Sequence, residues 1–270
     1  MLLALVFSSA GCAPRIPGVA VVVGNAHYAH SPALSNPEND ARALSNRLEE
    51  LGWAVALSID PSKAELEASI RSLDGKLRAS DKALFFYAGH GMQINGRNYL
   101  LPVDFNPTRP IDLDRDMIGI DQTLAQMKRP NNQLAVFLDA CRDNPFEDRI
   151  VRIGGKTRGF GLVPKRNAPR SANGMMIGRG LAEVEASAGT FIAYATQPGA
   201  VALDGTGKHS PFTDALLRYF TENNKDVGWV LQRVRNDVIK ETKGAQVPWD
   251  HSSLTERYMI NARQKRPPPP

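Results

Sequence analysis

The sequence predicts an α/β protein in which a mostly parallel sheet carries helices on both faces. Short apolar runs of strand length alternate along the chain with segments whose apolar residues recur at helical spacing. This alternation favours parallel strands, because each helix crosses over the sheet and returns the chain to the same edge. With 42% hydrophobic residues in 270, the chain can fill the core of one domain of ordinary size.

The first half of the chain contains most of the predicted elements. In order they are strands over 19–23, 53–59, 82–88 and 133–140, helices over 36–51, 62–77 and 121–127, and a hairpin around Asn95-Gly96. Gly52 ends the first helix. Ser62 and Glu65 form a capping box at the start of the second helix. The Asn-Gly pair favours a two-residue hairpin turn.

Regular structure resumes near the end of the chain. The predicted elements there are a strand over 190–195, helices over 211–220 and 226–240, and a closing strand over 257–260. Ser210 stands in the N-cap position of the first of these helices, where its hydroxyl can accept a hydrogen bond from the backbone. The second helix is amphipathic, since its valines and its leucine fall on one side.

Two of the apolar strands end at reactive side chains. The run over 82–88 is followed by Gly89-His90-Gly91, and the run over 133–140 is followed by Cys141. The carboxyl ends of parallel strands meet at one edge of a sheet, where α/β proteins keep their sites. We therefore expect His90 and Cys141, which are 51 residues apart, to lie close together.

The residue types at this edge suit nucleophilic catalysis. A cysteine thiolate attacks an amide carbonyl, an imidazole takes the thiol proton, and water later hydrolyses the acyl-enzyme. The N–H groups of Gly91 and Cys141 could stabilise the oxyanion by about 3 kcal/mol each. A lone buried cysteine or histidine more often only packs in a core. The pair at two strand ends favours catalysis over that alternative.

Several motifs resemble one known family. His90-Gly91 and Ala140-Cys141, each after an apolar block, resemble the signature of the caspase-type cysteine peptidases, whose His and Cys are also about 50 residues apart. Further resemblances, between about residues 18 and 260, point to the bacterial, metacaspase-like branch: Asn25-Ala26-His27-Tyr28, Asn36-Pro37-Glu38-Asn39-Asp40-Ala41 and Ser210-Pro211-Phe212-Thr213. Asp139 replaces the glutamine of the animal caspase signature.

The resemblance implies a fold and an activity. The fold is the caspase-like one, a mostly parallel six-stranded sheet with helices on both faces. The activity is that of a cysteine-type endopeptidase acting on proteins or peptides, with Cys141 as the nucleophile and His90 as the general base. The alternative from another class is a catalytically silent caspase-like interaction module. Inactive relatives commonly lose the histidine or the cysteine, whereas this chain has both.

The resemblance also implies a specificity. Asp139, two residues before the nucleophile, would line the pocket for the residue preceding the scissile bond, together with Asp40 from the first helix. Two carboxylates there favour arginine or lysine and repel acidic side chains. For Asp40 the alternative is a purely local role, since an aspartate near a helix start often serves only the helix dipole.

Residues 149–188 predict a long flexible loop inside the domain. Between 149 and 182 the chain has no acidic residue and many glycines. Its basic residues are Arg149, Arg152, Lys156, Arg158, Lys165, Arg166, Arg170 and Arg179. Loops of this length are functional or disordered in most compact domains. It is either a solvated insertion or, as in caspase-type enzymes, a segment that is cut during processing.

Charge and ligand patterns limit the partners. The net charge of +5 comes without any basic cluster that carries stacking aromatics, so we expect no nucleic acid. Neither zinc nor another required cofactor is expected, since ligand spacing is lacking. Calcium is kept as an optional activator, because several metacaspases bind it. Carboxylates that could bind it alternate at Asp112, Asp114 and Asp116, after Asp104. The segment lacks the glycine and the glutamate of a known calcium loop.

The ends of the chain lie outside the predicted peptidase domain, 18–262. Residues 1–17 read as a leader or a disordered N-terminus, and Ser9-Ala10-Gly11-Cys12 resembles a bacterial lipoprotein signal with Cys12 as the lipidated residue. No lysine or arginine precedes the apolar run. Export or lipid anchoring at the cell envelope is favoured over a cytoplasmic location, and Cys12 is the one expected contact with a membrane. Residues 263–270 form a proline-rich tail.

Overall fold

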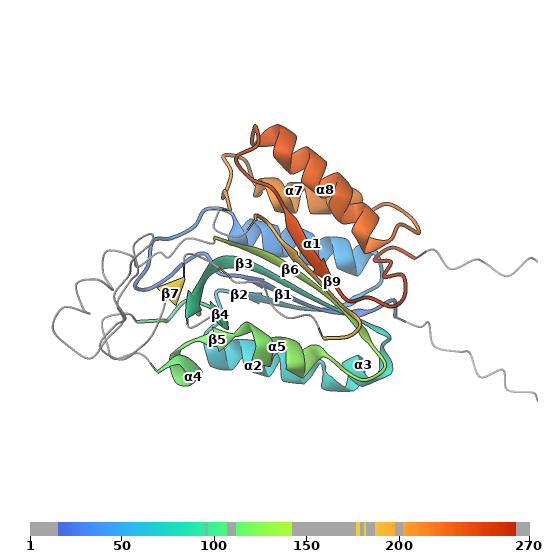
Figure 1. Cartoon of the computed structure of the whole chain (residues 1–270). Helices are drawn as coiled ribbons and strands as arrows, with labels where there is room; N and C mark the ends of the chain where they lie inside the picture. The colour runs from blue at the N-terminus through green and yellow to red at the C-terminus, as the bar shows by residue number, and fades with distance from the viewer. Residues whose placement is uncertain are drawn as a thin grey trace, which may run out of the picture.

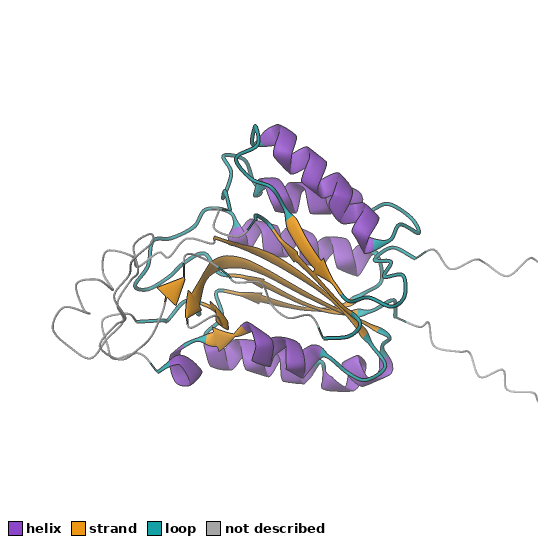
Figure 2. Ribbon diagram, viewed as in Figure 1, coloured by secondary structure: helices purple, strands orange, loops and turns teal. Residues whose placement is uncertain are grey.

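A twisted sheet forms the centre of the computed structural model, and helices cover both of its faces (Figures 1 and 2). The structure describes residues 16–94, 97–106, 112–141, 177–178, 181, 187–197 and 202–262. The predicted leader, most of the predicted loop and the proline-rich tail lie outside these residues. The three layers confirm the α/β class. No helix among the described residues combines the length and the apolar character that crossing a membrane requires.

Six strands follow one another across the main sheet. Their order is β2 (Ala54–Ile59), β1 (Val19–Gly24), β3 (Lys82–Ile94), β6 (Gln133–Cys141), β8 (Thr190–Tyr194) and β9 (Trp249–Ser252). The first five are parallel, and β9 runs antiparallel to β8 at the edge. Strands β3 and β6 therefore occupy the middle of the sheet, and their carboxyl ends lie side by side.

A smaller antiparallel sheet grows from the end of β3. The strand continues past the predicted boundary at residue 88 and pairs with β4 (Arg97–Leu100) and β7 (Ile177–Gly178), and β4 pairs with β5 (Ile118–Gly119). The antiparallel pairing of β3 with β4 agrees with the hairpin predicted around Asn95-Gly96, two residues that themselves lie outside the described structure.

The helices divide between the two faces (Figure 1). One face carries α1 (Pro37–Glu50), α7 (Pro211–Tyr219) and α8 (Val227–Glu241). The other carries α2 (Lys63–Ser72), α3 (Asp74–Ala79) and α5 (Ile120–Met127), and the short α4 (Leu113–Asp116) lies between β4 and β5 in the chain. Alternate residues of each strand supply the two cores. In β3, Phe86 joins the core with α1 and α7, and Phe85 joins the core with α2 and α5.

Two predicted elements differ from the structure. The helix over 62–77 is two helices, since the chain turns at Leu73 (φ −95°, ψ −1°) and Gly75 lowers the helix propensity beyond it. Its predicted capping box at Ser62 and Glu65 is present. The closing strand is not 257–260 but β9, Trp249–Ser252.

The error at the closing strand has a physical cause. Tyr258 and Ile260 have buried side chains because this segment crosses the end of the sheet, not because it pairs within it. The Tyr258 hydroxyl donates to the carbonyl of Ala83 (2.6 Å), and the Trp53 indole donates to the carbonyl of Ile260 (3.0 Å). Strand β9 is an exposed, polar edge strand, so its sequence lacks the apolar signal that revealed the other strands.

Candidate active site

The register of the sheet brings His90 and Cys141 together. Strands β3 and β6 pair in parallel from Lys82–Gln133 onward, and the last pair of this ladder is His90 with Cys141. The two residues predicted to meet at the sheet edge are therefore direct neighbours on adjacent strands. The Cys141 side chain lies outside the described structure, so the geometry of the site is built from His90 and its surroundings.

The His90 ring has one nitrogen engaged and one nitrogen unoccupied. Its Nε2 lies 3.0 Å from the carbonyl oxygen of Pro32. A carbonyl can only accept, so Nε2 carries the proton of the neutral ring. The other nitrogen, Nδ1, is buried and has no hydrogen-bond partner among the described residues. A neutral histidine in this tautomer presents the lone pair of Nδ1 as a proton acceptor.

Burial keeps this imidazole neutral. The His90 side chain is 5% exposed, and the ring of Tyr28 packs against it with 4.6 Å between centroids. Desolvation lowers the pKa of His90 below its ordinary value of 6.5, against smaller opposing effects of the Pro32 carbonyl and the charge of Asp204. At neutral pH, His90 is therefore in the form that can act as a base.

Two tyrosine hydroxyls fix the backbone on either side of the ring. The backbone N–H of His90 donates to the hydroxyl of Tyr28 (2.7 Å), and the hydroxyl of Tyr87 donates to the carbonyl of His90 (2.7 Å). A Cβ on Gly89 would lie 2.7 Å from both hydroxyls, and the φ of +151° at Gly89 also disfavours a side chain. In the sequence, Tyr28 stood out only as part of a motif, and Tyr87 did not stand out, because it resembles an ordinary core residue of an apolar strand.

Gly91 follows His90 at the start of the second sheet. A Cβ at this position would lie 3.0 Å from the Leu181 side chain, so a glycine lets the chains approach closely here. Its predicted role as an oxyanion donor, together with the backbone N–H of Cys141, stays a prediction.

The two predicted specificity aspartates meet in one pocket beside Gly89. Asp40 comes from the first turn of α1 and Asp139 from the end of β6, and they are 1% and 7% exposed. The pocket contains about 280 Å³ of atom-free space, part of it open to solvent. It is lined by Leu34, Pro37, Asp40, Ala88, Gly89, Asp139, Ala202, Leu203, Asp204 and Ser210.

The N-terminus of α7 holds both carboxylates. The backbone N–H of Ser210 lies 3.3 Å from each oxygen of Asp40, and the Ser210 hydroxyl donates to Asp139. The hydroxyl of Thr213 also donates to Asp139, at 2.9 Å. Among the described residues, the hydrogen-bond partners of the Asp40 carboxylate thus come from the segment before α7. Asp40 lines the pocket and contacts residues outside its own helix. Its role in specificity stays a prediction.

A third carboxylate lines the pocket, and sequence reasoning missed it. Asp204 accepts hydrogen bonds from the backbone N–H groups of Ser35 (2.7 Å) and Asn36 (3.3 Å), which ties the loop before α7 to the start of α1. No periodicity or motif marks this loop. The motif Ser210-Pro211-Phe212-Thr213 could have indicated it. The motif marks the start of a helix at this sheet edge, and an acidic residue shortly before that start, such as Asp204, lies at the same edge.

Burial and mutual repulsion raise the pKa values of the carboxyls. The pKa of Asp40 is raised to about 9 and that of Asp139 to about 6, and desolvation is the largest cause of both shifts. The negative charges of Asp139 and Asp204 add to the effect on Asp40, whereas the hydroxyls of Ser210 and Thr213 counteract it at Asp139. At neutral pH these shifts favour the protonated form of Asp40 and the ionised form of Asp139.

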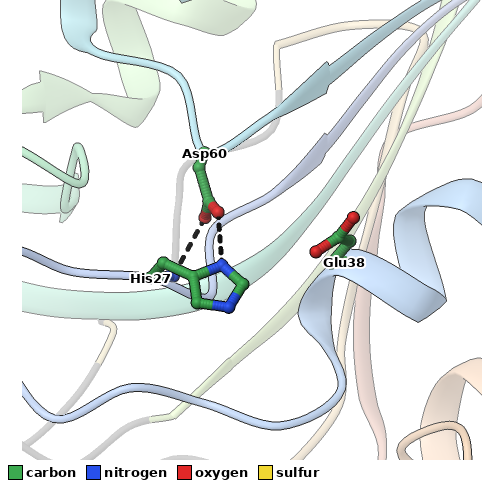
Figure 3. A group of neighbouring side chains, drawn as sticks. All are labelled: His27, Glu38 and Asp60. Atoms are coloured by element: carbon green, nitrogen blue, oxygen red, sulfur yellow. Dashed lines mark hydrogen bonds and ion pairs between the residues drawn. The ribbon is translucent and has the colours of Figure 1, made fainter.

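One group of described side chains is close enough together to share a metal ion. It consists of His27, Glu38 and Asp60, whose ligand atoms lie within 4.8 Å of one another (Figure 3). Asp60 accepts from His27 Nδ1 (2.7 Å) and from two backbone N–H groups, and Glu38 pairs with Arg42 (2.8 Å). These contacts account for the arrangement without an ion.

The alternating aspartates considered for calcium lie in and before α4. The Asp112 carboxylate caps this helical turn by accepting from the backbone N–H groups of Asp114 and Arg115, both at 3.1 Å. Asp116 accepts from the N–H of Asp112 (2.8 Å) and pairs with Arg115. Calcium activation stays a prediction.

Comparison with known proteins agrees with the family resemblance of the sequence motifs. The model of the caspase domain matches residues 17–259. Human mucosa-associated lymphoid tissue lymphoma translocation protein 1 is 27% identical over 251 residues, and its mouse homolog is 28% identical over 254; each alignment covers 90% of this chain. The chain spans about a quarter of the length of these relatives, since the alignments cover 26% of each.

A solved structure matches over nearly the whole chain. The crystal structure of caspase-1 from Spodoptera frugiperda superposes with a TM-score of 0.61 at 17% identity, covering 93% of this chain and 92% of the other. At this identity the match concerns the fold alone. It confirms the caspase-like fold that the sequence motifs implied.

Proposed function

The chain belongs to the caspase-domain family of peptidases, and from this premise we propose that it is a cysteine-type endopeptidase that cuts after arginine or lysine. The observation that supports catalysis is the pairing of His90 with Cys141 at the end of the β3–β6 ladder, with no described residue hydrogen-bonded to His90 Nδ1. The metacaspase-like, bacterial assignment is part of this proposal and rests on the sequence motifs.

The proposed reaction begins with activation of the thiol. His90 Nδ1 takes the proton of Cys141, while the Pro32 carbonyl holds Nε2–H and fixes the tautomer. The thiolate attacks the carbonyl carbon of the scissile bond, and the N–H groups of Gly91 and Cys141 stabilise the oxyanion by about 3 kcal/mol each. His90 then gives its proton to the leaving amine, and a water molecule hydrolyses the thioester.

The pocket supports a basic residue before the scissile bond. Three carboxyl groups, from Asp40, Asp139 and Asp204, line one small pocket next to Gly89, one residue before His90. A guanidinium or ammonium group offers the donors and the positive charge that such a site requires. An acidic side chain would bring a further negative charge into a largely buried site, which costs several kcal/mol.

A reporter assay tests the proposal. Purified protein is incubated with peptides that end in Arg, Lys or Asp before a fluorogenic amide, with and without calcium. We expect hydrolysis of the Arg and Lys reporters by the wild type and none by Cys141→Ala. Turnover retained in Cys141→Ala would contradict the mechanism. A folded wild type that cleaves no reporter with or without calcium would favour the silent interaction module instead.

A further inference from the structure

His209 connects the buried pocket to solvent. It lies in the loop before α7, and its Nδ1 is 2.8 Å from Oδ1 of Asp40. The His209 side chain is 21% exposed, whereas that of Asp40 is 2% exposed. The other described residue that hydrogen-bonds to the Asp40 carboxylate is Ser210, which cannot take up a proton at neutral pH. Among the described residues, His209 is therefore the titratable partner within hydrogen-bond distance of Asp40.

The charges around this contact place one proton on it. Asp139 and Asp204 face Asp40 from β6 and from the loop, and burial with their repulsion raises the pKa of Asp40 to about 9. Burial lowers the pKa of His209, and it outweighs the opposing charge of Asp214 on α7. Lys208, the neighbour of His209, also lowers its pKa. In the empty pocket, Asp40 is thus protonated, and its O–H donates to His209 Nδ1.

The arrival of a basic side chain changes this balance. A guanidinium or ammonium group beside Asp40 favours the carboxylate, so the proton must leave Asp40. The ionised carboxylate, 2.8 Å from His209 Nδ1, in turn favours the charged imidazole and opposes the effect of burial on that ring. We infer that His209 accepts this proton across the hydrogen bond, so that the pocket becomes ionised without releasing a proton to solvent. The inference rests on the proposed preference for basic residues. It makes His209 a positioning residue for specificity.

The proposed transfer balances in atoms and charge. The O–H bond of Asp40 breaks, a bond from hydrogen to Nδ1 of His209 forms, and no proton enters or leaves the protein. The resulting imidazolium and the bound cation together offset two of the three carboxylates, Asp40, Asp139 and Asp204. Without His209, the same proton would have to reach solvent, and binding would weaken as the pH falls.

Glutamine separates proton uptake from simple positioning. In His209→Gln the side-chain amide can still hydrogen-bond to Asp40, but it cannot accept a proton. His251→Gln on the edge strand β9 serves as the matched control. All variants carry Cys141→Ala in the full chain, so that a peptide with arginine before the scissile bond binds without being cut. A peptide with citrulline in its place is the neutral, equally shaped ligand.

Titration calorimetry in two buffers of different ionisation enthalpy counts the protons. With His209 present, we expect almost no net proton release on binding of the arginine peptide and little change of affinity with pH around neutrality. In His209→Gln, about one proton should be released, and the affinity should rise by up to tenfold per pH unit towards pH 9. At pH 7 the variant should bind more weakly than the wild type, by at most the roughly 100-fold cost of ionising a group with a pKa of about 9, because only the variant must release that proton to solvent. The citrulline peptide and His251→Gln should show no such change.

A second measurement does not depend on the variant. The 15N shifts of the His209 ring in the Cys141→Ala protein should change from the neutral to the protonated form on saturation with the arginine peptide at neutral pH. An unchanged neutral ring, or equal proton release with and without His209, would overturn the inference and leave the peptidase proposal standing. Equal binding of the arginine and citrulline peptides would contradict the basic pocket itself, and the inference with it.

Discussion

The His90–Cys141 pair and the acidic pocket lie at the same edge of the sheet, yet they are assembled differently. The pair is placed by backbone pairing, since β3 and β6 bring His90 and Cys141 into register at the end of one ladder. The pocket is placed by side chains from segments far apart in sequence, such as His209 on Asp40 and Ser210 on Asp139. We expect the first to determine whether the chain is a catalyst and the second to determine what it cuts.

The largest effect should come from replacing His90, the proposed general base, which tests whether the His90–Cys141 pair determines catalysis. His90→Ala should lower kcat for the arginine reporter by about 100- to 10,000-fold, because the thiol then lacks its proton acceptor. The KM should change little, since His90 does not line the pocket. Steady-state kinetics with both reporters measure the two constants. A loss confined to KM would contradict the assignment of His90 as the base.

The next largest effect should come from the pocket. Asp139→Asn should raise KM for arginine and lysine reporters by about 30-fold or more, because truncating one partner of a buried charge pair costs about 2 kcal/mol or more. The amide oxygen can still accept hydrogen bonds from the hydroxyls of Ser210 and Thr213, so the variant should fold. Reporters with citrulline before the scissile bond provide the control, and an equal loss on them would mean that Asp139 acts on catalysis.

The two regions should also differ in their response to pH. His90 must be neutral to act, and its lowered pKa means that kcat should fall only as the pH drops below the ordinary histidine value of 6.5. Asp139 must be ionised to hold a cation, and its raised pKa means that KM should rise as the pH falls through about 6. In Asp139→Asn the rise of KM at low pH should disappear, and the fall of kcat at low pH should remain. If KM still rose at low pH in this variant, a group other than Asp139 would be responsible for that rise.

What the sequence could predict follows the same division. His90 and Cys141 were found because apolar strands are visible as runs, and whatever follows parallel strands shares one edge. Asp139 was found through its place two residues before the cysteine. Asp204 and His209 lie in a loop without periodicity, and their partners at the start of α1 are about 170 residues away in sequence. Only the tertiary structure reveals such contacts.

The edge strand illustrates the same limit in the fold itself. Strand β9 is polar and largely exposed, so its sequence has no burial pattern. The segment 257–260 imitates a strand by its apolar residues, of which Tyr258 and Ile260 are buried. The Asn36-to-Ala41 motif, in contrast, predicted that Asp40 faces the pocket, although helix chemistry alone allowed a local role. Motif resemblance was decisive there, because burial of a carboxylate is not visible in sequence.

The smallest expected effect sharpens the comparison inside the pocket. Asp40→Asn resembles the protonated form that burial favours in the empty pocket, where the pKa of Asp40 is raised to about 9. The amide should therefore cost less than at Asp139, about tenfold in KM for the arginine reporter, or about 1.4 kcal/mol. It should also abolish proton release in His209→Gln, because no ionisable group remains at position 40. Kinetics of the single variant and calorimetry of the double variant measure the two effects. If Asp40→Asn raises KM as much as Asp139→Asn does, Asp40 is ionised before the substrate binds. The charges of the pocket are then set in advance, as the position of the His90–Cys141 pair is.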